Sequence, residues 1–247
     1  MSRILKGGQS RDNKYSKVFE TSLFTIISFV LFFLVHCRPS PVFLLPLPSK
    51  IERMEGYASL RITGEQGSAR SRFSFLFQLP HQGRIEFSNL LGRTLYQIII
   101  DKDKAVFMIP SKKVYWQGEE EEIIRNFLGF RLNLYEMISF LSGKWEDQEI
   151  GIEGERSMKS WTLEKDEKGR IMAGQRAEFR FKIEKFFADT PCAQLLIFQH
   201  PLNKGRLKIL RINFNQPIKK EAFSFSILES YERKNWAEIE KILANEN

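Results

Sequence analysis

The chain has 247 residues, 43% hydrophobic and 28% charged, a balance that excludes a disordered protein and predicts one sizeable core. Its 38 Lys and Arg outnumber 30 Asp and Glu, and this net charge of +8 is spread along the sequence. A diffuse excess argues against a nucleic-acid partner and suits a basic surface or an anionic membrane. Two Cys and three His exclude a disulfide-rich scaffold and argue against a His/Cys metal site.

The first 36 residues have the pattern of an export signal. Basic residues precede an uncharged apolar run over 23–35, which is shorter than the roughly 20 residues that span a bilayer as a helix. The run ends in Leu-Val-His-Cys at Cys37 and resembles the lipobox of bacterial lipoproteins, in which the Cys is acylated and becomes the first mature residue. We therefore expect a signal peptide over 1–36 and a palmitate-type anchor on Cys37. An uncleaved membrane anchor and ordinary secretion are the alternatives.

A proline-rich segment follows the apolar run. Residues 38–50 contain four prolines, which oppose both helix formation and strand pairing. We expect residues 37–50 to be the acylated Cys and a semi-rigid tether that leads to the folded body. With Cys37 acylated, no disulfide can form within one chain, so Cys192 is predicted to be a packed or free thiol.

Alternation of apolar and polar residues predicts strands in the first half of the body. Phe73, Phe75 and Phe77 share one strand face, and Pro80 to Gly83 form the turn that follows. The strands expected in this half are 72–79, 84–88, 95–100, 105–109 and 114–116.

Two helices are predicted in the middle of the chain. Acidic residues over 119–122 suit the first turn of a helix that ends at Gly129. We interpret this acidic run as a solvated helix start rather than a metal or acid/base cluster. Asn133 is the expected N-cap of a second helix, which Gly143 ends.

The second half of the body returns to strand patterns and ends in a helix. Strands are expected over 161–163, 170–173, 177–183, 207–214 and 223–227. Trp236, Ile239 and Ile242 recur at helical spacing within 234–243, which predicts an amphipathic helix packed on the sheet. A role of this helix at a membrane surface is the alternative.

Three features together resemble the outer membrane lipoprotein receptor family LolB, within the fold group that includes the periplasmic carrier LolA. The first is Glu-Phe-Ser-Asn-Leu-Leu-Gly-Arg-Thr-Leu over 86–95, and the second is Leu-Gly-Phe-Arg-Leu-Asn-Leu over 128–134 with the helix over 137–143. The third is the order of lipobox, tether, strands, helix pair and strands. The resemblance covers most of residues 51–217.

The resemblance implies a mainly β fold with helices. The expected architecture is a curved antiparallel half-barrel of about eleven strands over 51–228, closed by a helical lid around an apolar cavity. Residues 229–247 would form the C-terminal amphipathic helix. The residues expected to line the cavity are Phe73, Phe75, Phe77, Ile85, Phe87, Ile98, Ile100, Phe107, Phe127, Leu134, Met137 and Leu141.

In this family a protruding loop carries a Leu that enters the membrane, and that residue falls on Leu91, beside Leu90. A turn Leu gains about 1.5–3 kcal/mol when it leaves water for lipid. The alternative is that both leucines fold into the core.

The resemblance implies a lipid-anchored protein at the periplasmic face of the outer membrane. It would accept acylated lipoproteins or lipids from a LolA-like carrier and help to insert them, as a monomer without cofactor, metal or nucleic acid. The alternative is a structural or interaction lipoprotein of the same fold with a filled core. An enzyme is not expected, because the sequence has no Gly-x-Ser-x-Gly nucleophile motif and no glycine-rich phosphate loop in its body.

Overall fold

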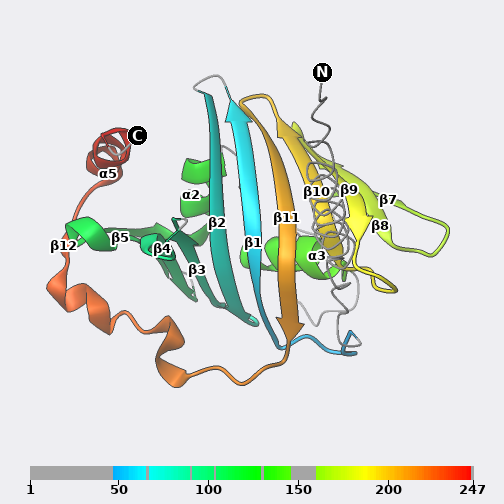
Figure 1. Cartoon of the computed structure of the whole chain (residues 1–247), viewed down its shortest axis with the longest axis horizontal. Helices are drawn as coiled ribbons and strands as arrows, with labels where there is room; N and C mark the ends of the chain where they lie inside the picture. The colour runs from blue at the N-terminus through cyan, green and yellow to red at the C-terminus, as the bar shows by residue number, and fades with distance from the viewer. Residues whose placement is uncertain are drawn as a thin grey trace, which may run out of the picture. The chain divides into compact units, whose positions relative to one another are not determined.

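An open twelve-stranded sheet carries the fold, in the order β12-β6-β5-β4-β3-β2-β1-β11-β10-β9-β8-β7 (Figure 1). The computed structural model describes residues 47–64, 67–89, 91–102, 104–128, 131–145 and 160–245. Every described element lies in one compact unit, Val42–Asn247. The expected export signal and Cys37 lie outside the described residues. Among the described residues, no helix combines the length and apolarity needed to cross a membrane.

Two meanders of consecutive antiparallel strands build the sheet. The first contains β1 Arg53–Gly64, β2 Gly67–Gln78, β3 Gln82–Ser88, β4 Thr94–Asp101, β5 Lys104–Ile109 and β6 Val114–Glu119. The second contains β7 Thr162–Lys165, β8 Ile171–Arg176, β9 Phe179–Phe186, β10 Ala193–His200 and β11 Asn203–Phe214. β1 pairs with β11 and joins the two meanders, with Leu60 opposite Leu207. These eleven antiparallel strands confirm the expected mainly β, half-barrel architecture, to which the two-residue β12, Glu232–Arg233, adds a parallel strand beside β6.

Helices α2 (Glu120–Leu128) and α3 (Leu134–Ser142) lie over one face of the sheet, called the inner face here (Figure 1). The side chain of Asn133 accepts a hydrogen bond from the Glu136 amide and the Glu136 side chain accepts one from the Asn133 amide, as in a capping box. Gly143 ends α3 with a φ of 73°, the left-handed conformation that glycine adopts without strain. Both predicted helix boundaries of α3 are confirmed.

The strand predicted over 223–227 is wrong. The segment forms two 3-10 helices, η2 (Lys220–Phe223) and η3 (Ser226–Ser230). Its backbone bonds to itself, since the Leu228 amide donates to the Phe225 carbonyl at 3.0 Å. Phe223 and Phe225 do share a face as a strand would require, but Ile227 is 46% exposed.

The segment after β11 covers the outer face of the first meander. Phe223 packs there with Ile99 of β4 and with Val106 and Met108 of β5. After β12 the chain continues into α5 (Trp236–Ala244), which starts two residues later than predicted because Asn235 is its cap. We call residues 215–245 the tail.

The tail returns to the inner face at the β6 side of the sheet. The ring centroid of Trp236 lies 5.9 Å from that of Phe107 and 5.4 Å from that of Trp116. Ile239 of α5 is fully buried in the main core. The tail therefore contacts both faces of the first meander.

Candidate functional site

An apolar cavity of about 130 Å³ lies between the inner face of the sheet and the helices. Its walls contain only apolar side chains, contributed by both meanders, α2, α3 and the segment between these helices. The lining residues are Leu60, Phe73, Phe75, Phe77, Ile85, Phe87, Ile98, Ile124, Leu132, Met137, Phe140, Leu141, Phe179, Leu196, Phe198 and Leu207. Eight of these were expected from the sequence: Phe73, Phe75, Phe77, Ile85, Phe87, Ile98, Met137 and Leu141.

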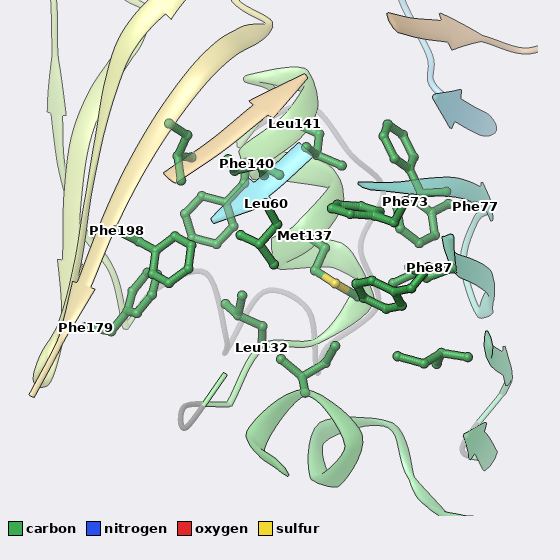
Figure 2. Close-up of a pocket in the computed structure, with 16 residues that line it drawn as sticks. Leu60, Phe73, Phe77, Phe87, Leu132, Met137, Phe140, Leu141, Phe179 and Phe198 are labelled. Atoms are coloured by element: carbon green, nitrogen blue, oxygen red, sulfur yellow. The ribbon is translucent and has the colours of Figure 1, made fainter. Parts of the chain in front are cut away.

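Aromatic rings stand on opposite sides of the cavity. Figure 2 shows Phe73, Phe77 and Phe87 on one side and Phe179 and Phe198 on the other. Leu132 and Met137 project between these two groups (Figure 2). Strand alternation explains the arrangement, because residues two apart in sequence point to the same face.

Three expected lining residues lie behind the walls instead. Ile100 and Leu134 approach the space over Gly83, which has no side chain to fill it. Phe107 is covered by Trp236 of the tail and by Tyr96, at 5.8 Å between ring centroids. All three are core residues, and the side chain of Phe127, the twelfth candidate, lies outside the described residues.

The cavity wall also contains residues of β1 and of the second meander that were not predicted from the sequence. Leu60 and Leu196 lie on β1 and β10, two strands that were not predicted. Phe179 belongs to an alternating segment that was recognised as a strand but was not assigned to the cavity. The available signal was the alternation in β9, whose apolar face continues the wall.

A buried polar cluster fixes α3 over the second meander. The Glu136 carboxylate is 1% exposed, accepts a hydrogen bond from Trp161 Nε1 at 2.9 Å and forms an ion pair with Arg176. The Arg176 guanidinium also lies 4.6 Å from the centroid of the Trp161 ring. A buried carboxylate needs such partners, so this cluster specifies where α3 begins.

A buried thiol lies where α3 ends. The Cys192 thiol donates to the Ser142 carbonyl at 3.4 Å, and burial raises its pKa to about 11. The predicted free, packed thiol is confirmed. Among the described residues, no group of three or more His, Cys, Asp or Glu is placed to hold a metal ion.

The loop between β3 and β4 contains two hydrogen bonds to one side chain and presents an apolar residue to solvent. Asn89 Oδ1 accepts hydrogen bonds from the amides of Leu91 and Arg93, both at 3.0 Å, and Gly92 adopts a φ of 78°. Leu91 is 88% exposed, so it does not fold into the core. Leu90 lies outside the described residues.

The family model described as outer membrane lipoprotein LolB matches residues 53–208. Similar solved structures include a LolA superfamily protein from Nitrosomonas europaea, with 10% identity, a TM-score of 0.48 and coverage of 73% of this chain and 92% of that chain. A DUF1329 family protein from Desulfovibrio piger has 8% identity, a TM-score of 0.49 and coverage of 72% and 92%. No curated protein matches the sequence.

Proposed function

The chain belongs to the outer membrane lipoprotein LolB family, and from this premise we propose that it binds acyl chains of lipoproteins or lipids and helps insert them in the outer membrane. Family membership supports a role in lipoprotein localisation. The observation that carries the finer proposal is the cavity, whose sixteen lining residues are all apolar.

Such a cavity suits an acyl chain because burial of each CH₂ contributes about 0.8 kcal/mol. The cavity has a volume of about 130 Å³, close to the ~150 Å³ of an apolar cavity that holds one benzene. An acyl chain is longer than a benzene ring is wide, so binding requires α2 and α3 to move away from the sheet. Leu132 and Met137, which project into the cavity (Figure 2), would move with them.

The exposed Leu91 loop supports the insertion step. Its hydrogen bonds hold Leu91 in water, where an apolar side chain of this size gains nothing, while transfer to lipid contributes about 1.5–3 kcal/mol. The loop would therefore contact the bilayer while cargo leaves the cavity.

The proposed function also needs a membrane anchor for this protein and a carrier that delivers the acylated cargo. An acylated Cys37 and the tether would hold the protein at the periplasmic face of the outer membrane. A soluble LolA-like carrier would supply the acylated cargo to a monomer, and transfer would follow differential apolar burial without cofactor, metal or covalent catalysis.

Titration of the Val42–Asn247 body with a fluorescent acyl probe tests the cavity, with a diacylated lipopeptide as competitor. The body is a suitable sample because it is one compact unit with its own core. We expect saturable binding that the lipopeptide displaces. Met137→Trp, which adds a ring to the cavity, should weaken probe binding at least tenfold. Absence of binding by a cooperatively folded body would favour an interaction lipoprotein with a filled core.

Leu91→Glu tests the loop. We expect unchanged probe binding and roughly a 10- to 100-fold slower transfer of the probe to vesicles, as the loss of about 1.5–3 kcal/mol implies. Ile227→Glu is a matched control, because Ile227 is another exposed apolar residue that lies on the tail. Equal transfer rates for the Leu91 variant and the wild type would contradict the role of the loop.

A further inference from the structure

Basic side chains from β2, β1, β11 and β9 gather on the outer face of a stretch of five adjacent strands, in which β10 lies between β11 and β9. Arg61 on β1 lies opposite Arg70 on β2 and opposite Arg206 on β11. Arg206 lies opposite Ile197 of β10, which lies opposite Lys182 of β9. One row of register positions thus crosses five strands with four basic residues and no acidic residue.

The two neighbouring rows contain three and two basic residues and, like the first row, no acidic residue. The row on one side joins Arg72, Ser59, Lys208, Leu195 and Lys185 across the same strands. The row on the other side adds Lys204 and Arg180. We call these nine exposed residues the basic face: Arg61, Arg70, Arg72, Arg180, Lys182, Lys185, Lys204, Arg206 and Lys208.

Strand alternation separates the basic face from the cavity. Leu60 and Leu207 line the cavity, so their sequence neighbours Arg61 and Arg206 point to the opposite face of the sheet. These charges are spread over residues 61–208 of the sequence, and only the pairing of β1 with β11 brings them together.

The acidic residues of the described chain, which include the exposed Glu184 on β9, form no ion pair with the basic face. None of its nine side chains takes part in the ion pairs found among the described residues. Arg61 Nε instead lies 3.4 Å from Ser68 Oγ. Like charges directly opposite each other on neighbouring strands are unfavourable, so solubility alone would be better served by alternating signs.

We propose that the basic face docks on a bilayer that contains anionic phospholipid, an inference that rests on the proposed membrane-anchored function. Five strands make the face about 19 Å wide at ~4.8 Å per strand spacing, which suits many headgroups rather than one ligand. Half-buried Leu195 and Ile197 lie between the cations and offer apolar contact. The tether of roughly 14 residues keeps the body within about 46 Å of an anchored Cys37, so a membrane is always in reach.

This orientation has a direct consequence for the lid. Helices α2 and α3 cover the inner face of the sheet (Figure 1), so docking through the outer face turns them away from the bilayer. A docked molecule would present its lid to a soluble carrier. Docking and insertion through Leu91 are then separate membrane contacts, with separate residues.

Vesicle co-sedimentation of the Val42–Asn247 body tests the proposal. The vesicles contain 30% phosphatidylglycerol in phosphatidylethanolamine, against neutral phosphatidylcholine vesicles, at low and high NaCl. A basic residue near an anionic surface contributes about fivefold to binding. The triple variant Arg61→Gln, Lys182→Gln and Arg206→Gln should therefore bind anionic vesicles about 100-fold more weakly.

The control variant removes the same charge elsewhere: Lys168→Gln, Lys219→Gln and Lys241→Gln, all exposed. We expect it to bind within about threefold of the wild type, since long-range charge effects are screened by salt. A second row variant, Arg72→Gln, Lys185→Gln and Lys208→Gln, should reproduce the loss. Unfolding curves of each variant check that the fold is intact.

Equal binding of the triple variant and the wild type would overturn the proposal, and so would an equal loss in the control. Wild-type binding no tighter to anionic than to neutral vesicles would also overturn it and leave an acidic protein as the partner. Acyl-probe binding in the same samples reports on the proposed function separately. Leu91→Glu should leave docking unchanged.

Discussion

The two meanders of the sheet differ in how many of their faces are covered. In β5 of the first meander, Ala105, Val106, Phe107, Met108 and Ile109 are all buried. In β9 of the second, buried and exposed residues alternate from Phe179 to Lys182. The difference follows from the tail, which covers the outer face of β4 and β5 and leaves the outer face of β9 in water.

This difference explains the composition of the strands. A strand with one wet face alternates, whereas a strand buried on both faces becomes a continuous apolar run. Continuous runs usually accompany parallel sheets covered by helices on both sides, yet here the sheet is antiparallel and a C-terminal segment provides the second cover. Such a run in this sequence therefore predicts a cover on the outer face.

Removal of the contact between the tail and the outer face of the first meander should have the largest effect on the free energy of unfolding. Phe223→Ala is expected to lower the free energy of unfolding by about 3–4 kcal/mol, because it leaves a cavity against Ile99 and Met108. Ile227→Ala, on the same tail but 46% exposed, should cost less than about 1 kcal/mol. Urea unfolding of both variants measures the difference. Equal small losses would mean that the tail does not cover the first meander in solution.

The contacts of α3 with the second meander should have the next largest effect on the free energy of unfolding. Glu136 and Glu238 occupy the same position in two capping boxes, but only Glu136 is buried, with Trp161 and Arg176 as partners. Glu136→Ala should cost about 2–3 kcal/mol by leaving those donors unpaired. Glu238→Ala should cost about 0.5 kcal/mol. Similar values in thermal unfolding would contradict a specific role of the buried cluster.

The free energy of unfolding should also depend on pH through Cys192, at the end of α3. The pKa of Cys192 rises from 9.0 to about 11 on folding, so the folded state disfavours the thiolate. Its contribution is complete below pH 9 and is lost as the pH rises from 9 towards 11, by about 1.4 kcal/mol per pH unit. Unfolding free energies of the wild type and Cys192→Ala over this interval check the effect. Parallel pH profiles of the two proteins would show that the thiol does not titrate in this way.

Much of the fold was predictable because local signals matched it. Asn133 and Gly143 gave both ends of α3, and the spacing of Phe73, Phe75 and Phe77 gave the cavity face of β2. The repeat of Phe223 and Phe225 misled for a physical reason. Phe223 and Phe225 flank Ser224, which is extended with a φ of −70° and a ψ of 138°, so the two rings have the spacing of a strand although a 3-10 turn stands on either side.

The site was harder to predict than the fold. Ile100 and Phe107 alternate correctly for the inner face, but Leu134 and the tail residue Trp236 cover them. Alternation predicts the sheet face to which a side chain points, but it does not predict which other side chains cover that side chain. Leu91 was located only through the resemblance, since exposure of a turn residue depends on how the loop is closed, here by Asn89.

The pairing of β12 with β6 has a consequence for contacts between molecules. An open sheet of twelve strands has two edges, and unpaired backbone at an edge is a template for aggregation. At one edge β12 pairs with Val114 and Tyr115 of β6, and Trp236 packs on Trp116. At the other edge lies β7, four residues long with Glu164 and Lys165 at its end. Both edges are therefore short or charged, so this large sheet offers little backbone to which another copy could add a strand.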